Sequence, residues 1–278
     1  MDQIHTNKIV GDERMLREFL QILPELQRDE VYFLSLSARN KYLTDEERKT
    51  FDLGRTEMFS RHTAFDRGGI LMAIARMEAD LNVRRTRNGS EIPAKCLVCY
   101  MNIHPSSTLK AYTAFKNQLD SHYNETFMAV VNDKQPNYEP FLRSRTHLMN
   151  HIQKSSSRKL FVDIDIDCDN VANLEKAYEH IHSRLVKASI RHHIIHTQGG
   201  YHILVDKESM KTADPKFPLY RHVENANDIV SGEMGIEGSC DMMDKAFETN
   251  GEVVFNKNAM VPLPGTFQAG KLVAFASS

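Results

Sequence analysis

The sequence predicts a mixed α/β protein. Stripes of apolar residues at helical spacing fill the first third of the chain, and from about residue 94 short apolar strands alternate with amphipathic helices. With 278 residues, of which 41% are hydrophobic and 26% charged, the chain can bury a sizeable core. Its 35 Lys and Arg residues are balanced by 37 Asp and Glu residues, so any nucleic-acid site must be a local patch.

Residues 1–93 are expected to form a mostly helical region. Apolar stripes predict helices over 15–23 and 70–81, and a Thr-x-x-Glu capping box at 44–47 predicts the start of another. A short apolar run at 31–36 indicates a strand. Because the region also carries arginines, we expect it to be an attachment that guides a nucleic-acid template.

Residues 94–278 are expected to form a second unit of alternating strands and helices. A polar Lys-Ser-Ser-Ser-Arg connector separates its first strand and helix from the remainder. The expected elements are, in order, a strand at 96–103, a helix that begins near 106 with Leu109, Tyr112, Phe115 and Leu119 on one side, a strand at 160–167, a helix at 173–188, and strands at 192–197 and 201–205.

The strand at 160–167, Leu-Phe-Val-Asp-Ile-Asp-Ile-Asp, is the most informative stretch. Successive side chains of a strand point to opposite faces, so Asp163 and Asp165 share a face among bulky apolar neighbours. Such carboxylates need a partner, a proton or a cation, and oxygen ligands at this spacing suit a divalent metal ion. The alternative is an exposed edge strand with hydrated acids. A calcium loop is excluded, because neither possible frame has the required glycine and glutamate.

A second informative stretch is the Gln-Gly-Gly turn that ends at Gly200. Two glycines let the backbone reverse tightly, and His202 then opens the next strand between apolar neighbours. A histidine in this position can donate to a phosphate, although alone it would more often be a core residue. Because the sequence also contains the acidic strand, a phosphate-binding role for His202 is favoured over a core role.

Further candidates lie near the carboxyl end. Asp241 and Asp244 each place a carboxylate among apolar residues. A Pro-Leu-Pro-Gly turn then fixes the backbone, so that Thr266, Gln268 and Lys271 would be held toward one spot.

Two other clusters have simple alternatives. Cys96 and Cys99 have the spacing of a zinc half-site, with His104 nearby, but no second pair completes it, so buried small hydrophobes are the default. A basic patch is the best candidate for nucleic-acid contact, with a solvated loop face as its alternative. The patch would comprise Arg84, Arg85 and Arg87, supported by Arg55, Arg61, Arg67, Arg143, Arg145, Lys154, Arg158 and Lys159.

Three of these motifs, taken in order, resemble the signature of the archaeo-eukaryotic primase superfamily, including its primase-polymerase members. The resemblance covers residues 94–275. The motifs are Asp163-Ile-Asp165, Gly200-Tyr-His202, and Asp241 followed by the Leu-Pro-Gly-Thr segment that ends at Thr266.

The resemblance implies an α/β unit packed on an RRM-like antiparallel sheet unit, with the active site in the cleft between them and the helical region of 1–93 added to this catalytic core. Two Mg²⁺ or Mn²⁺ ions would be held by Asp163, Asp165 and Asp241, with Asp244 as the competing third ligand. A nucleoside triphosphate would be bound by Gly200, His202, Thr266, Gln268 and Lys271. Pro262 stands where many relatives carry Arg or Lys, which removes one phosphate contact.

The function implied is that of a DNA primase or primase-polymerase, a nucleotidyltransferase of DNA replication that works on a single-stranded DNA template; a replicative helicase is a candidate partner. A metal-dependent nuclease or rolling-circle replication initiator is one alternative, but its histidine pair would have to come from His193 and His196, which fall on opposite strand faces. A non-catalytic single-strand-binding module is another, and it would need more aromatic residues than the 8% present.

No apolar run is long enough to span a bilayer, and the first residues lack the apolar core of a secretory signal. We therefore expect an intracellular (cytoplasmic) protein without membrane contact, of the kind that a phage or plasmid encodes for replication.

Overall fold

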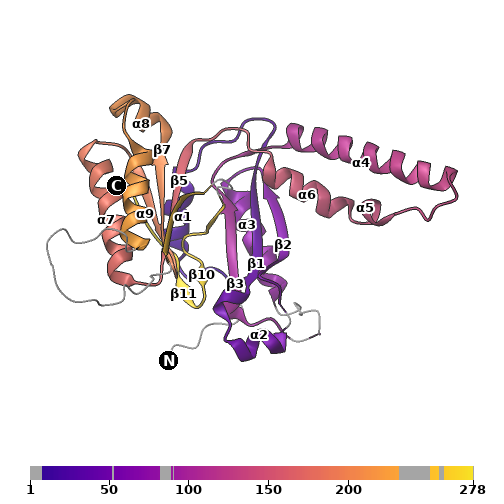
Figure 1. Cartoon of the computed structure of the whole chain (residues 1–278), viewed down its shortest axis with the longest axis horizontal. Coiled ribbons are helices and arrows are strands. Elements are labelled where there is room, and N and C mark those ends of the chain that lie inside the picture. Colours follow the sequence, from indigo (N-terminus) through magenta and orange to yellow (C-terminus); the bar gives the residue numbers. More distant parts are fainter. Residues whose placement is uncertain are drawn as a thin grey trace.

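Two antiparallel sheets, of seven and five strands, lie side by side in this computed structural model (Figure 1). The structure describes residues 8–51, 53–81, 89, 91–231, 251–256 and 260–277. The mixed α/β class that the sequence predicts is confirmed.

The larger sheet has β1 near its centre and runs in the order β11-β10-β3-β1-β2, with β4 paired to β1 and β9 to β3. Nine of the ten residues of β1 are buried, because the strand is paired on both sides and covered on both faces. The strands are β1 (Glu30–Arg39), β2 (Thr56–Ala64), β3 (Leu97–Asn102), β4 (Ser106–Ser107), β9 (Met260–Pro262), β10 (Phe267–Gln268) and β11 (Lys271–Leu272).

The smaller sheet contains the acidic strand, β5, as an interior strand of the order β12-β6-β7-β5-β8. Because β5 is paired to β7 on one side and β8 on the other, the edge-strand alternative is excluded. The register places Asp165 opposite His202. The strands are β5 (Phe161–Cys168), β6 (His192–His196), β7 (Gly200–Asp206), β8 (Gly251–Phe255) and β12 (Ala274–Ser277).

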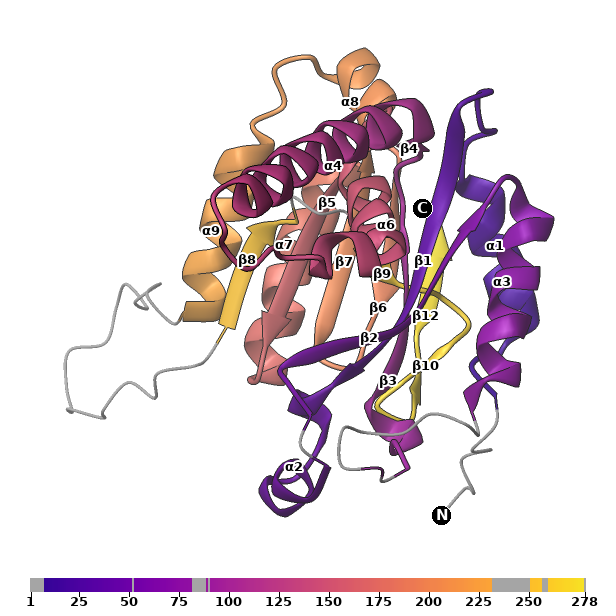
Figure 2. The same cartoon turned by 90° about the vertical axis from the view of Figure 1, so that its right-hand side faces the viewer.

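Helices cover the outer faces of both sheets (Figure 2). α7 and α9 lie on the smaller sheet, and α1 and α3 lie on the larger one. The apolar stripe predicted for α7 is buried in full, at Leu174, Ala177, Ile181 and Leu185. The helices are α1 (Glu13–Ile22), α2 (Asp45–Phe51), α3 (Arg67–Ala79), α4 (Thr108–Val131), α5 (Glu139–Leu142), α6 (Ser144–Lys154), α7 (Val171–Lys187), α8 (Lys207–Ala213) and α9 (Leu219–Ser231), with 3-10 turns η1 (Asn40–Tyr42) and η3 (Ala94–Cys96). None of the described helices is both long enough and apolar enough to cross a membrane.

Among its described residues the amino-terminal region is not mostly helical, which corrects the expectation for 1–93 in that part of the chain. It supplies β1 and β2, and β1 pairs with β3 on the far side of the predicted boundary. One apolar cluster also joins α1 and α3 to Ile195 and Leu204 of the smaller sheet. Sequence analysis missed β2. Most of its side chains are partly exposed on both faces of the strand, so apolar and polar residues do not alternate along it.

Helix α4 begins where predicted, and the Ser107 hydroxyl caps it by accepting from the Lys110 N–H. The apolar side predicted for it is not buried, however: Leu109 is 68% exposed and Tyr112 is 55% exposed. The reason is that α4, α5 and α6 project from the body of the molecule as a helical arm (Figure 1), so most of α4 has no sheet to cover.

Candidate functional site

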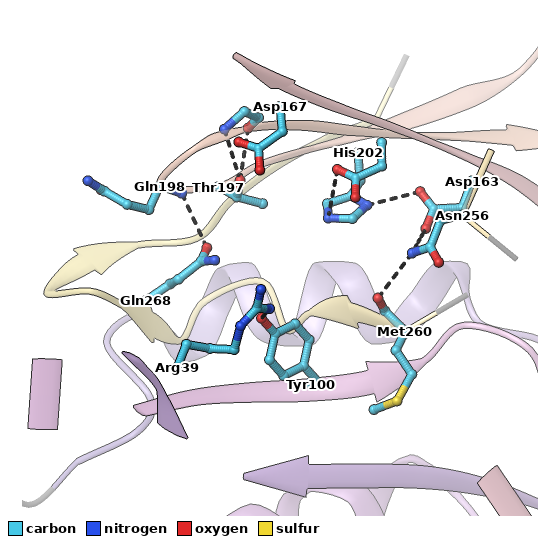
Figure 3. A network of polar contacts seen from close by, with 12 residues as sticks. Arg39, Tyr100, Asp163, Asp167, Thr197, Gln198, His202, Asn256, Met260 and Gln268 are labelled. Atoms are coloured by element: carbon cyan, nitrogen blue, oxygen red, sulfur yellow. Dashed lines mark hydrogen bonds and ion pairs between the residues drawn. The ribbon is translucent and has the colours of Figure 1, made fainter. Parts of the chain in front are cut away.

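A cleft of about 360 Å³ lies between the two sheets. The smaller sheet contributes Asp165, Asp167 and His202, together with Thr197 and Gly199 of the turn before β7. The larger sheet contributes Ser35, Ser37 and Arg39 of β1, Tyr100 of β3 and Gln268 of β10. Figure 3 shows the two walls facing each other, with Asp167 and His202 on one side and Arg39 and Tyr100 on the other.

The acidic wall follows from the alternation of β5. Ile164 and Ile166 point into the apolar cluster beneath α7 and α9, so the three aspartates point the other way. Their side chains become more exposed along the strand, from 0% at Asp163 to 39% at Asp165 and 58% at Asp167. The predicted shared face is therefore confirmed, and the two outer carboxylates are the ones open to the cleft.

His202 lies between two of these carboxylates. Its Nδ1 is 3.1 Å from Asp163 Oδ1, and its Nε2 is 3.6 Å from Asp165 Oδ1. Burial alone would lower the pKa of His202, but the charge and hydrogen bond of Asp163 and the charges of Asp165 and Asp167 outweigh it and raise the pKa to about 9. The imidazole is therefore protonated at neutral pH and binds both acids.

Asn256 holds the other side of Asp163 and was missed by sequence analysis. Its amide Nδ2 donates to Asp163 Oδ2 at 2.7 Å, and its backbone N–H donates to the Asp163 carbonyl at 2.9 Å. Both carboxylate oxygens of Asp163 are thus engaged, one by His202 and one by Asn256. The available signal was a polar residue directly after the apolar strand Val-Val-Phe of β8.

Two cations, Arg39 at the end of β1 and Lys41 in the turn η1 that follows it, face the acids and were also missed. Arg39 donates from Nη1 to the Tyr100 hydroxyl at 2.6 Å, and its guanidinium carbon lies 5.9 Å from the centroid of that ring. Lys41 Nζ lies 3.5 Å from Asp167 Oδ2. Arg39 ends the apolar run of β1 much as the aspartates interrupt β5, and that parallel could have singled it out.

Gln268 connects the two sheets at the cleft. Its Oε1 accepts from the Gln198 N–H at 3.2 Å, and its Nε2 donates to the Tyr42 hydroxyl at 2.6 Å (Figure 3). Gly200 has a packing role beside it, because a Cβ there would lie 1.7 Å from the Ile166 carbonyl oxygen. The Gly200 N–H is occupied by Thr197 Oγ1 at 3.1 Å.

The remaining predicted nucleotide contacts do not line this cleft. Thr266 is fully buried, and its hydroxyl donates to the Leu263 carbonyl at 2.6 Å. Lys271 is exposed on β11, where it is paired with the cleft-lining Gln268 but does not itself line the cleft. The predicted third acid, at Asp241 or Asp244, lies outside the described residues.

Three supporting residues of the predicted basic patch make contacts within the protein, and one of them, Arg61, lines a hollow together with Arg145. Arg158 binds the buried carboxylate of Glu30, Arg67 donates to the Leu23 carbonyl, and Arg61 donates to Asn150 Oδ1. These three side chains are engaged within the protein and do not form one surface. Arg84, Arg85 and Arg87 lie outside the described residues.

The alternatives that rest on cysteine and histidine find no support. Cys96 and Cys99 lie in different apolar clusters, and burial raises the pKa of each thiol to about 12. His193 packs against Phe161 and Phe275 on one face of β6, whereas His196 stacks on Tyr201 on the other. The predicted opposite orientation of this histidine pair is confirmed.

The cleft offers oxygen ligands of the type that a divalent cation prefers, but its side chains are not arranged around a metal site. Within the described ranges, no group of three or more His, Cys, Asp or Glu side chains is arranged to hold a metal ion. Asp165 and Asp167 nevertheless present carboxylate oxygens to the cleft, and Mg²⁺ is commonly bound by one or two carboxylates with water and substrate phosphates completing its shell. These two side chains are therefore the ones that could hold such an ion.

The chain matches no family model, no curated protein and no solved structure. What the cleft binds is therefore inferred from its side chains.

Proposed function

We propose that this chain is a metal-dependent nucleotidyltransferase of the primase-polymerase kind, which joins nucleoside triphosphates on a single-stranded DNA template. The observation that carries the proposal is the pair of opposed walls, with aspartates on one side of a single cleft and Arg39 and Lys41 on the other. A metal-bound polyphosphate needs both, because its cation seeks carboxylates and its remaining negative charge seeks arginine and lysine. The cleft volume also falls within the range of small-ligand sites.

The proposed roles follow from exposure and contacts. Asp165 and Asp167 would hold Mg²⁺ or Mn²⁺, and the saturated carboxylate of Asp163 would fix the position of His202. A divalent ion bound there would activate the attacking hydroxyl and neutralise charge on the departing pyrophosphate. Arg39 and Lys41 would orient the polyphosphate.

His202 is proposed first as a positioning residue. Both of its ring nitrogens face carboxylates, so the phosphate contact expected from the resemblance requires one of those acids to release it. Asp241 stays a predicted third ligand. The finer fold assignment is likewise a proposal, supported by the antiparallel arrangement of the smaller sheet with α7 and α9 on one face and the two motif strands, β5 and β7, adjacent.

Primer synthesis tests the proposal directly. The chain is incubated with unprimed single-stranded DNA and labelled nucleotides, with Mg²⁺, with Mn²⁺ or without metal. We expect metal-dependent growth of oligonucleotides with release of pyrophosphate. Asp165→Asn should reduce synthesis by roughly 100-fold or more, because it removes a charged ligand that acts in the transition state. Asp45→Asn is the matched control, since that side chain is 89% exposed on α2.

Three outcomes would contradict the proposal. Full activity of the Asp163→Ala Asp165→Ala double variant would show that these carboxylates are not required for nucleotidyl transfer. Nicking of DNA with a protein-linked 5′ end would identify a rolling-circle initiator instead. Metal-independent binding of single-stranded DNA without synthesis would identify a binding module.

A further inference from the structure

The helical arm has an unusual distribution of polarity. Helix α4 packs on α6 through polar side chains: Gln118 accepts from His151 Nε2 at 2.6 Å, and its Nε2 lies 3.5 Å from His147 Nδ1. The ring of His122 lies 6.5 Å from that of His147. Two helices that pack in water normally bury their apolar stripes against each other. Here the inward face of α4 is mixed, because Ala111 also joins Ile152 of α6 in an apolar cluster and the ring of Phe115 lies 6.2 Å from that of His151.

The outward face of α4 is apolar toward both ends of the helix and charged in the middle. Leu109, Tyr112, Tyr123, Phe127, Val130 and Val131 are each more than half exposed. Their spacing, together with that of Lys116 and Asp120 in the middle, follows the three- and four-residue steps of a single helical stripe. Met128 is also exposed but falls off this stripe.

The size of the stripe points to a protein partner. A helix of 24 residues is about 36 Å long, and the six exposed side chains offer on the order of 600 Å² of surface. A typical stable interface buries roughly 800 Å² on each partner, which the flanking Lys116 and Asp120 and the arm beside them would help to reach. Exposed apolar patches of this size mark interaction sites.

The stripe is complementary to itself when reversed. If two copies of α4 run antiparallel with residue 118 at the two-fold axis, Leu109 of one chain faces Phe127 of the other, and Tyr112 lies one residue out of register with Tyr123. At the centre, Lys116 of each chain faces Asp120 of the other. Lys116 and Asp120 already lie 2.6 Å apart within one chain, so the dimer would place four alternating charges around the axis.

We propose that α4 pairs antiparallel with α4 of a second copy of this chain, so that the helical arm is a homodimerisation device. An isologous interface needs one surface that is complementary to itself under a two-fold rotation, and the palindromic order of apolar and charged residues on α4 meets that requirement. The proposal rests on the arm alone and does not depend on the chemistry of the cleft.

Sedimentation equilibrium of the full chain, from about 1 to 100 μM, tests the pairing. We expect twice the chain mass, and we expect Phe127→Lys to give a monomer because it buries an unpaired charge opposite Leu109. Met72→Lys is the matched control: Met72 is also a large apolar residue, 59% exposed, on α3. Tyr123→Lys is a second disrupting variant, and circular dichroism verifies that each variant retains its helices.

Charge reversal and cross-linking test the register. Asp120→Lys should weaken the dimer about 10-fold by placing like charges around the axis, and adding Lys116→Asp should restore it. A Leu109→Cys Phe127→Cys double variant should form an interchain disulfide in oxidant, while Leu109→Cys alone should not. The proposal would be overturned by a chain that stays monomeric to 100 μM, by a dimer that survives Phe127→Lys, or by association that occurs only when single-stranded DNA bridges two copies.

Discussion

Replacing Glu30 with glutamine is expected to destabilise the protein by about 3 kcal/mol at pH 7 and to flatten the dependence of its stability on acid. The Glu30 side chain at the start of β1 is fully buried, and Arg158 donates to it through Nε at 2.8 Å and Nη2 at 2.7 Å. The Gln27 N–H also donates to it, at 2.7 Å. Because Arg158 lies just ahead of β5, this pair ties the acidic strand to the larger sheet.

The magnitude follows from the pKa of the buried carboxyl. Burial alone would raise the pKa of Glu30, but the hydrogen bonds from Arg158 and Gln27 outweigh it and lower the pKa from 4.5 to about 2. A difference of this size between the unfolded and folded states corresponds to about 3 kcal/mol. Since the folded state binds its proton less readily, this stabilisation is complete above pH 4.5 and is lost as the pH falls toward 2.

Urea unfolding at several pH values between 7 and 2 measures the effect. The wild-type free energy of unfolding should fall more steeply with acid than that of Glu30→Gln, and the two curves should converge at low pH. Glu18→Gln is the control, because the ion pair of Glu18 with Arg14 is exposed and should contribute less than about 1 kcal/mol. Parallel curves for Glu30→Gln and wild type would refute the argument.

Three further outcomes are expected. Gly200→Ala should lower the free energy of unfolding by about 3 kcal/mol or more, because its Cβ would lie 1.7 Å from a backbone carbonyl oxygen. Gly54→Ala is the control, because its Cβ would lie 3.5 Å from the nearest atom, and it should have little effect in the same urea titration. Burial raises the pKa of the Cys96 and Cys99 thiols to about 12, so both should stay unreactive toward a thiol reagent at pH 8 until the chain is unfolded. Rapid labelling of these two thiols in the folded protein would show that they are accessible. Arg39→Gln should raise the KM for nucleotide by roughly 10- to 100-fold in steady-state kinetics while leaving the affinity for Mn²⁺ unchanged; an unaltered KM would remove Arg39 from the phosphate site.

Local patterns predicted the elements whose two faces meet different surroundings. The alternation in β5 gave the shared orientation of its aspartates, and the periodicity of α7 gave its buried stripe, because each has a core on one side only. β2 has no such contrast, since most of its residues are half-buried. On α4 the periodicity predicted a helix with an apolar side, but Leu109 and Tyr112 on that side are exposed, because sequence does not distinguish a core-facing side from one on the surface.

The candidate site was predictable on one wall only. Asp163, Asp165 and His202 come from neighbouring strands of one sheet, so their proximity follows from ordinary strand pairing. Asn256 is brought to Asp163 by the pairing of β8 with β5, two strands distant in sequence, whereas Arg39 comes from the other sheet, so its arrival depends on how the two sheets pack. Thr266 was placed in the site because it follows a rigid turn, but that turn instead directs its hydroxyl toward the protein interior.

The contacts that join the two walls near Asp167 are weak compared with the apolar cluster behind them. Among the described residues, the walls meet there through the hydrogen bond from Gln198 to Gln268 and through the half-exposed ion pair of Lys41 with Asp167. A neutral hydrogen bond contributes about 1 kcal/mol and an exposed ion pair less, so parting this side costs only a few multiples of thermal energy. Any opening needed for the proposed single-stranded template would therefore begin at this rim, while the apolar cluster stays packed.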